Sequence, residues 1–256
     1  MIVDVDAAPA PAFALAEELP AGPGGWHAHQ RHQLLYARAG TLSLEAEDAT
    51  WLLPPQRAAW IPGGVAHRVE VRRAVSLRTS YLRADLVAAP PAGCRVFAVS
   101  TLLAEMLVEA TRWGPARDPD PVADAFFAAL GGLCAERARS SLAFRLPRAR
   151  TPEVALAMRF ARERLADPIA LPEAARAAGV SERTLRRRFR EEVGLGWAEY
   201  LQAARMIAAT EALSQAGASV TDTAHAVGYR SLAAFSDAFL AFTGERPARW
   251  SKRAAP

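Results

Sequence analysis

Apolar residues change their spacing along the chain, and the change separates two kinds of structure. Between residues 33 and 82, short apolar runs alternate with turn residues such as Gly40 and the pair Pro54-Pro55. Runs of this length, interrupted by glycine and proline, are typical of the strands of a small β-sandwich or barrel. The preceding residues 1–25 are rich in alanine, proline and glycine, and we expect them to form an irregular arm.

From residue 101 onward, apolar residues recur at the three- and four-residue spacing of helices. The spacing predicts one helix over residues 101–113 and another over residues 121–139, separated by a breaker segment that contains glycine and proline. After a basic linker near residues 145–150, helical spacing continues to the C-terminus. The sequence therefore predicts an α+β fold with two domains, residues 1–145 and residues 146–256.

A helix-turn-helix pattern occurs twice in the second domain. Residues 171–179 align with residues 220–228 at one constant offset, so that Gly179 stands opposite Gly228. After each glycine comes a second helix, whose inward residues recur four positions apart. Two adjacent units of this kind indicate a protein that binds specific DNA sequences.

The second helix of the first unit has one apolar face and one basic face. We expect Ser181 to be its N-cap and Leu185 and Phe189 to point inward. Arginine binds guanine O6 and N7 with two hydrogen bonds, or it binds phosphate, and a helix fits the major groove. An ordinary solvated helix is the alternative for one arginine-rich segment, but the duplicated turn favours DNA binding. The arginines on the outer face are Arg183, Arg186, Arg187 and Arg190.

The second half of the chain resembles the AraC/XylS family of transcription regulators. The resemblance covers about residues 152–251, and its motifs are residues 181–189, the second turn at residues 227–231 and residues 243–250. It implies two helix-turn-helix subdomains joined by a long helix, here about residues 197–214, with both recognition helices in successive major grooves. By this resemblance, the expected DNA-contacting residues are Ser181, Arg183, Arg186, Arg187, Arg190, Arg230, Ser231, Leu232, Ala233, Ser236 and Asp237.

One position departs from the family pattern. Asp237 aligns with Arg187, where the family commonly has a basic residue, and Leu240 also stands where a basic residue is common. An acid there repels phosphate, although it is able to accept a hydrogen bond from cytosine N4. We therefore expect the first unit to supply most of the affinity for DNA and the second to add limited sequence discrimination.

Charge is unevenly distributed. Residues 145–256 hold 18 basic and 12 acidic residues, whereas residues 1–144 hold 13 and 15. The positive part of the chain is thus the part expected to bind DNA. No apolar run reaches the ~18–20 residues that cross a bilayer, and Asp4 and Asp6 stand where a signal peptide would be basic. Together with only two cysteines, these features indicate a cytoplasmic protein.

Four residues of the first domain suggest a metal site. His27, His29 and Gln33, followed later by His67, resemble the two cupin motifs, in which histidines and an acid bind a divalent metal. The alternation places His27 and His29 on one face of a strand. Gln33 replaces the acid, yet three imidazoles and an amide oxygen suit Zn, Ni, Co or Fe. The alternatives are that the histidines line an effector pocket without metal, or that they are structural.

The segment between residues 32 and 62 looks like the cupin sensor domain of a subgroup of AraC regulators. Tyr36, Arg57 and Trp60 are then the expected effector-binding residues. Aromatic walls with one cation suit a small planar or anionic organic ligand. Buried tryptophans are, however, more often simply part of a core.

The resemblance implies a cupin-like β-barrel with flanking helices, followed by an all-α domain of two helix-turn-helix subdomains. We expect a transcription regulator, with activator as one expected role, whose partners are double-stranded DNA, RNA polymerase and a small-molecule effector. The two helices of the first domain are the expected homodimer contacts. The alternative is a metal-dependent, dioxygenase-like cupin enzyme with a helical accessory domain. It is disfavoured because no carboxylate occupies the motif position and no nucleophile motif is present.

Overall fold

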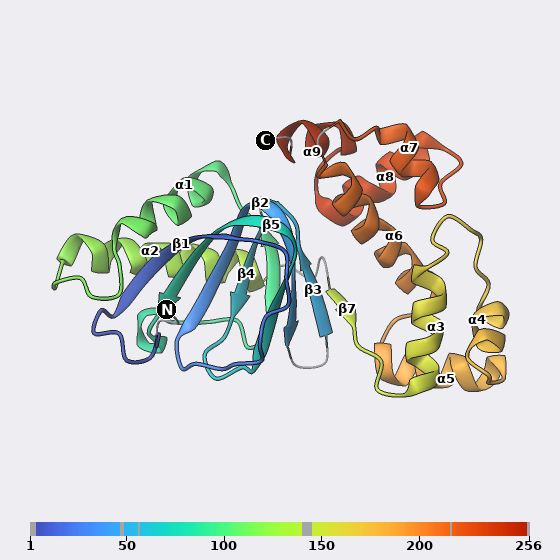
Figure 1. Ribbon diagram of the computed structural model, residues 1–256, viewed down its shortest axis with the longest axis horizontal. Helices are drawn as coiled ribbons and strands as arrows, with labels where there is room; N and C mark the ends of the chain where they lie inside the picture. The colour runs from blue at the N-terminus through green and yellow to red at the C-terminus, as the bar shows by residue number, and fades with distance from the viewer. Residues whose placement is uncertain (1–3, 47–48, 56, 140–144, 216, 255–256) are drawn as a thin grey trace. The chain divides into compact units, whose positions relative to one another are not determined.

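The chain forms two compact units, which together contain an antiparallel sheet and a series of helices (Figure 1). The computed structural model describes residues 4–46, 49–55, 57–139, 145–215 and 217–254. One unit consists of residues 1–47 and 51–145, and the other consists of residues 146–256 together with residues 48–50. An α+β fold, with the sheet first and the helical unit second, is therefore confirmed.

Two long strands form the middle of the sheet in the first unit. Strand β5 lies between β1 and β2, and the first half of β2 pairs with β4 as well as with β5, all in antiparallel register. Strand β6 pairs with the outer side of β4. The strands span Ala12–Leu19 (β1), His32–Ala46 (β2), Ala49–Leu53 (β3), Arg57–Ile61 (β4), His67–Leu82 (β5), Arg95–Ala98 (β6) and Arg145–Pro147 (β7).

Two helices cover one face of this sheet (Figure 1). They are α1 (Thr101–Glu109) and α2 (Pro121–Arg139), with short 3₁₀ turns at Ala84–Leu86 and Ala110–Arg112. Their apolar sides meet the sheet in one core that contains Trp60 and Phe127, both fully buried. Helix α2 has the bounds that apolar spacing predicts, whereas α1 ends at Glu109 and a 3₁₀ turn takes the place of its predicted last turn. Each helix presents an apolar stripe to the sheet.

The expectation of an irregular N-terminal arm is wrong in part, because β1 lies within it. Its residues pair with β5 from Ala12 opposite Leu82 to Leu19 opposite Val75. Gly40 is also not a turn between strands. It lies inside β2 with φ of +80°, where shifts in register mark a bulge against β5. A bulge of this kind bends a strand without ending it.

The second unit is helical, and its two helix-turn-helix pairs have the same local geometry. Ser181 and Ser231 cap α5 and α8 by accepting backbone hydrogen bonds, and Gly179 and Gly228 make the turns with positive φ. Helix α6 joins the pairs. The helices span Pro152–Arg162 (α3), Leu171–Ala177 (α4), Glu182–Val193 (α5), Trp197–Leu213 (α6), Val220–Ala226 (α7), Leu232–Thr243 (α8) and Pro247–Ala254 (α9). Among the described residues, no helix is both long and apolar enough to cross a membrane.

Candidate DNA-binding surface and ligand cavity

Helix α5 separates an apolar inner face from a basic outer face. Leu185 and Phe189 are buried in the core of the first helix-turn-helix pair. The Ser181 hydroxyl accepts a hydrogen bond from the backbone N–H of Thr184 at 3.2 Å, which fixes the start of the helix. The expected arginines Arg183, Arg186, Arg187 and Arg190 are all exposed on the opposite face.

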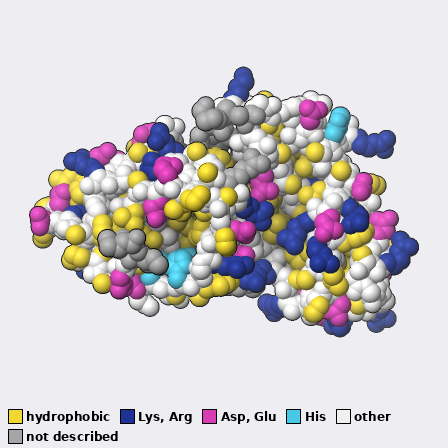
Figure 2. Space-filling view, viewed as in Figure 1, with side chains coloured by type: hydrophobic (Ala, Val, Ile, Leu, Met, Phe, Trp, Pro, Cys, Tyr) yellow, Lys and Arg dark blue, Asp and Glu magenta, His cyan; other side chains and the backbone are white. Residues whose placement is uncertain are grey.

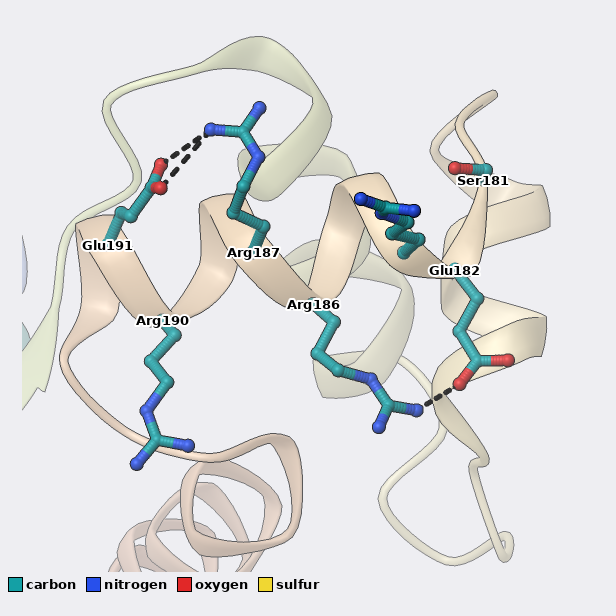
Figure 3. A pocket seen from close by; sticks show the side chains of 7 residues that line it. Ser181, Glu182, Arg186, Arg187, Arg190 and Glu191 are labelled. Carbon is teal, nitrogen blue, oxygen red and sulfur yellow. Dashed lines mark hydrogen bonds and ion pairs between the residues drawn. The ribbon is translucent and has the colours of Figure 1, made fainter.

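Two of these arginines have acidic partners on the same helix. Arg186 is paired with Glu182, and Arg187 is paired with Glu191 at 3.0 Å. Figure 3 shows these pairs and places Arg186 and Arg190 on the same side of the helix. The residues line a shallow surface pocket, and basic side chains are spread over the visible face of this unit in Figure 2. Since both ion pairs are exposed, each contributes only ~0.2–1 kcal/mol and is easily exchanged for a phosphate or base contact.

Arg188 differs from its neighbours because it points back to the protein. Its guanidinium group pairs with Glu153 of α3 at 2.9 Å, and both side chains are only about one-third exposed. Arg188 is therefore held by a partner within the protein.

Helix α8 presents a different surface at the positions that correspond to the basic face of α5. Leu232 is 47% exposed, Ala233 is exposed and Ser236 is half-buried. Asp237 pairs with Arg246, just before α9, at 3.2 Å between Oδ1 and Nη1. The pairing with Arg246 was not foreseen, because nine residues and a helix end separate the two in sequence. Arg230 and Ser231 stand exposed at the start of this helix.

Three histidines of the first unit converge as their sequence pattern suggested. One ligand atom from each of His27, His29 and His67 lies within 4.8 Å of the others. The expectation that His27 and His29 lie on a regular strand is wrong, because both belong to a loop between β1 and β2. An isolated bridge between His27 and His67 holds this loop to β5, with backbone N···O distances of 3.0 and 2.9 Å.

Hydrogen bonds orient all three rings in the same way. Each Nδ1 lies 2.8–3.1 Å from a backbone carbonyl oxygen, that of Gly25, Arg31 or Val65. A carbonyl only accepts, so each Nδ1 carries a proton, and in the neutral ring the lone pair is on Nε2. Burial lowers the pKa of His67 to about 4, which keeps this ring neutral, and its Nε2 is buried without a hydrogen-bond partner.

Gln33 extends this cluster toward Tyr81. Its Oε1 lies 3.1 Å from Nε2 of His29, and its Nε2 donates a hydrogen bond to the Tyr81 hydroxyl at 3.2 Å. Two lone-pair atoms at this separation are stabilised either by a shared cation or by rotation of the amide. The four side chains thus fit a divalent metal by donor type and orientation.

A cavity of about 370 Å³ lies beside this cluster, over the face of the sheet that α1 and α2 do not cover. Gln33 and His27 contribute to its wall, and strands β1, β2 and β5 supply Glu17, Thr79 and Tyr81 as further polar groups. Apolar side chains complete the wall. They are Leu19, Leu35, Val69, Val71 and Leu77.

The expected effector residues lie elsewhere. Tyr36 and Trp60 belong to the core beneath the helices, and Arg57 is buried on β4. None of these three is among the described residues that line the cavity. For Tyr36 the physical reason is the two-residue period of a strand, which places it on the opposite face of β2 from Gln33 and Leu35.

Comparisons with known proteins identify both units. Residues 18–147 match the family model of the AraC-like ligand-binding domain, and residues 174–253 match that of a helix-turn-helix domain. The HTH-type transcriptional regulator NimR of Escherichia coli is 28% identical over 227 residues, which are 89% of this chain and 82% of that protein. A putative AraC-like transcription regulator of Streptomyces antibioticus is 31% identical over 209 residues, 80% of this chain but 58% of that longer protein.

Among solved structures, ToxT of Vibrio cholerae matches 95% of this chain and 99% of its own, at 8% identity and a TM-score of 0.40. The matched domains and curated relatives belong to transcription regulators and not to enzymes.

Proposed function

Because this chain belongs to the AraC-type family of transcription regulators, with a ligand-binding domain before its helix-turn-helix domain, we propose specific residues for its DNA and effector sites. The observation that carries the proposal is the outer face of α5, where four arginines stand exposed opposite a buried apolar face. We propose that α5 enters a major groove and that its arginines bind bases and phosphates.

We propose that α8 enters a second groove with a different chemistry. Its exposed Leu232 and Ala233 suit apolar contact with thymine methyl groups, and Ser236 suits a hydrogen bond to a base edge. Asp237 excludes phosphate and accepts a hydrogen bond from cytosine. Arg230 and Ser231, before the helix, suit contacts to the DNA backbone.

The cavity is the proposed effector site, in place of Tyr36, Arg57 and Trp60. It has the volume of a small-molecule site, apolar walls and a few convergent polar groups. An effector shifts the balance between DNA-binding and non-binding states only if it binds one of them more tightly.

A divalent metal is a proposed component of the same unit. His27, His29 and His67, with Gln33 as a fourth side chain, would hold it, and the orphaned Nε2 of His67 supports this fit. Such an ion would cross-link the loop before β2 to the start of β5 and would supply a Lewis-acidic group beside the cavity.

Two further partners are proposed. Leu102 of α1 and Val122 of α2 are apolar and 64% and 70% exposed, which suits contacts between two copies of the chain. RNA polymerase is the other proposed partner, and the proposed location is the cytoplasm, where the DNA is.

Fluorescence anisotropy tests the DNA proposal. Purified protein is titrated against the DNA beside its own gene and against a scrambled duplex, at two salt concentrations. We expect affinity that falls steeply with salt and a preference of roughly 10³-fold or more for the cognate DNA. Absence of binding to either duplex, even at low salt, would refute the proposal.

A further inference from the structure

Glu17 places a carboxyl group in the wall of the cavity without a compensating cation. It is half-buried on β1, opposite Leu77 of β5. Burial raises the pKa of Glu17, and no described basic side chain is paired with it. Buried charges in proteins are normally paired, so an unpaired carboxylate in a cavity leaves an interaction for a ligand to complete.

Thr79, two residues beyond Leu77 on the same face of β5, supplies a second polar group without a partner. Thr79 is 1% exposed and lines the cavity, yet its hydroxyl oxygen is buried without a hydrogen-bond partner. Two residues further along β5, Tyr81 completes a polar row on one wall. Burial, and secondly the nearby Glu17, raises the pKa of Tyr81, and its hydroxyl group lies in the cavity wall.

Apart from His27 and Gln33, the side chains in the remainder of the wall are apolar. Leu19, Leu35 and Leu77 come from three neighbouring strands, and Val69 and Val71 continue the wall along β5. None of the described residues that line the cavity is lysine or arginine. When no metal occupies the histidine cluster, the wall therefore offers an organic anion neither a salt bridge nor an arginine fork, and Glu17 repels it.

We propose that the effector is a small organic cation, such as a protonated amine with an apolar body. Its charged nitrogen binds Glu17, the Thr79 and Tyr81 hydroxyl groups complete the hydrogen bonds, and the body contacts the leucine and valine side chains. This inference rests on the proposal that the cavity is the effector site. It replaces the sequence-based expectation of a small planar or anionic ligand, which depended on Tyr36, Arg57 and Trp60.

Matched ligand pairs test the charge preference on the full-length protein. Benzylamine is compared with benzoate, and cyclohexylamine with cyclohexanecarboxylate, by the shift in the thermal unfolding midpoint at millimolar concentration. We expect the amines to raise Tm in a concentration-dependent manner and the carboxylates to leave it unchanged. Carboxylates that stabilise as well as amines, or no response to any amine, would overturn the proposal.

Three variants test whether the amines bind in this cavity. Glu17→Gln keeps the shape of the side chain and is expected to weaken amine binding at least ten-fold, and Thr79→Val to weaken it by less. Glu18→Gln is the control, because Glu18 is exposed and bound to Ser76 and Arg78 outside the cavity. If Glu18→Gln has the same effect as Glu17→Gln, the amine binds elsewhere and the proposal is wrong.

Fluorescence anisotropy with DNA on the same samples distinguishes a failure of the proposed ligand class from a failure of the proposed DNA-binding surface. Wild-type protein that binds its cognate DNA but ignores amines would refute only the ligand class. Wild-type protein that takes up amines but binds no DNA would instead refute the assigned DNA-binding surface.

Discussion

Replacing Arg187 is expected to weaken DNA binding, whereas replacing its neighbour Arg188 is not. Arg187 is 62% exposed on the outer face of α5, and its only described ion-pair partner is the exposed Glu191. Arg188 is turned toward α3, where it pairs with Glu153. The two positions are adjacent, so the variants Arg187→Ala and Arg188→Ala remove the same side chain from opposite environments.

The expected loss follows from two competing terms. Releasing Arg187 from Glu191 costs ~0.2–1 kcal/mol, because exposed ion pairs of this kind are weak. A bidentate contact to guanine contributes about 1–3 kcal/mol, so the exchange favours DNA. The net term is therefore about 0–2.8 kcal/mol, so Arg187→Ala should weaken cognate binding by up to about a hundred-fold, and a base contact would make this loss larger than the loss for scrambled DNA.

Anisotropy at several salt concentrations distinguishes the type of contact. If Arg187 binds phosphate, the slope of log affinity against log salt becomes shallower by ~0.9 and the loss is the same for all sequences. If Arg187 binds a base, the slope changes little, and the protein distinguishes less well between bases at one position of its DNA site. The reasoning fails if Arg188→Ala weakens binding as much as Arg187→Ala while its thermal stability matches that of the wild type.

Three further outcomes follow from the structure. Gly228→Ala should destabilise the protein more than Gly179→Ala does, by about 1–3 kcal/mol. Both glycines have positive φ, but of the two only Gly228 would place a Cβ against a backbone oxygen, that of Leu165 at 2.6 Å. Equal midpoints of the two variants in urea unfolding would contradict this. Zinc should raise Tm of the wild type but not of His67→Ala, and the control His225→Ala, on α7, should keep the response; zinc stabilisation that survives in His67→Ala would exclude the triad. Burial raises the pKa of Cys134 from 9 to about 12, so the thiol loses its proton at lower pH in the unfolded chain than in the folded protein. The contribution of Cys134 to folding stability is therefore present below pH 9 and falls as the pH rises toward 12. Reaction of the Cys134 thiol with Ellman's reagent in the folded protein at neutral pH would refute that burial.

The helical unit was predictable because its signals are local. Caps such as Ser181, turn glycines and four-residue spacing lie within a few positions of one another, and their repetition supplied an internal check. The interaction of Asp237 with Arg246 was missed because it joins the middle of α8 to the residue before α9. Nothing in the spacing of a single helix indicates such a contact.

The ligand cavity was only partly predictable, because it depends on which strands become neighbours. Strand β1 was missed because its alternation is weak in an alanine-rich segment, and Glu17 was missed with it. The prediction that Tyr36 binds the effector could have been avoided from the sequence alone. Gln33 and Tyr36 are three positions apart, so a strand places them on opposite faces, and one cannot line the same cavity wall as the other.

We expect the two recognition helices to contribute unequally to DNA binding. Helix α5 carries its positive charge on exposed arginines that only weak ion pairs restrain, and such charge attracts any phosphate backbone. Helix α8 contains no basic residue, and its Asp237 is held by Arg246 in an equally exposed pair. On DNA, Arg246 is able to exchange Asp237 for a phosphate at a cost of only ~0.2–1 kcal/mol, but the released Asp237 then repels the phosphate backbone unless a cytosine amino group donates a hydrogen bond to it. We therefore expect α8 to add little to affinity and to add limited sequence discrimination, because its apolar and acidic surface favours only sites with a suitable base.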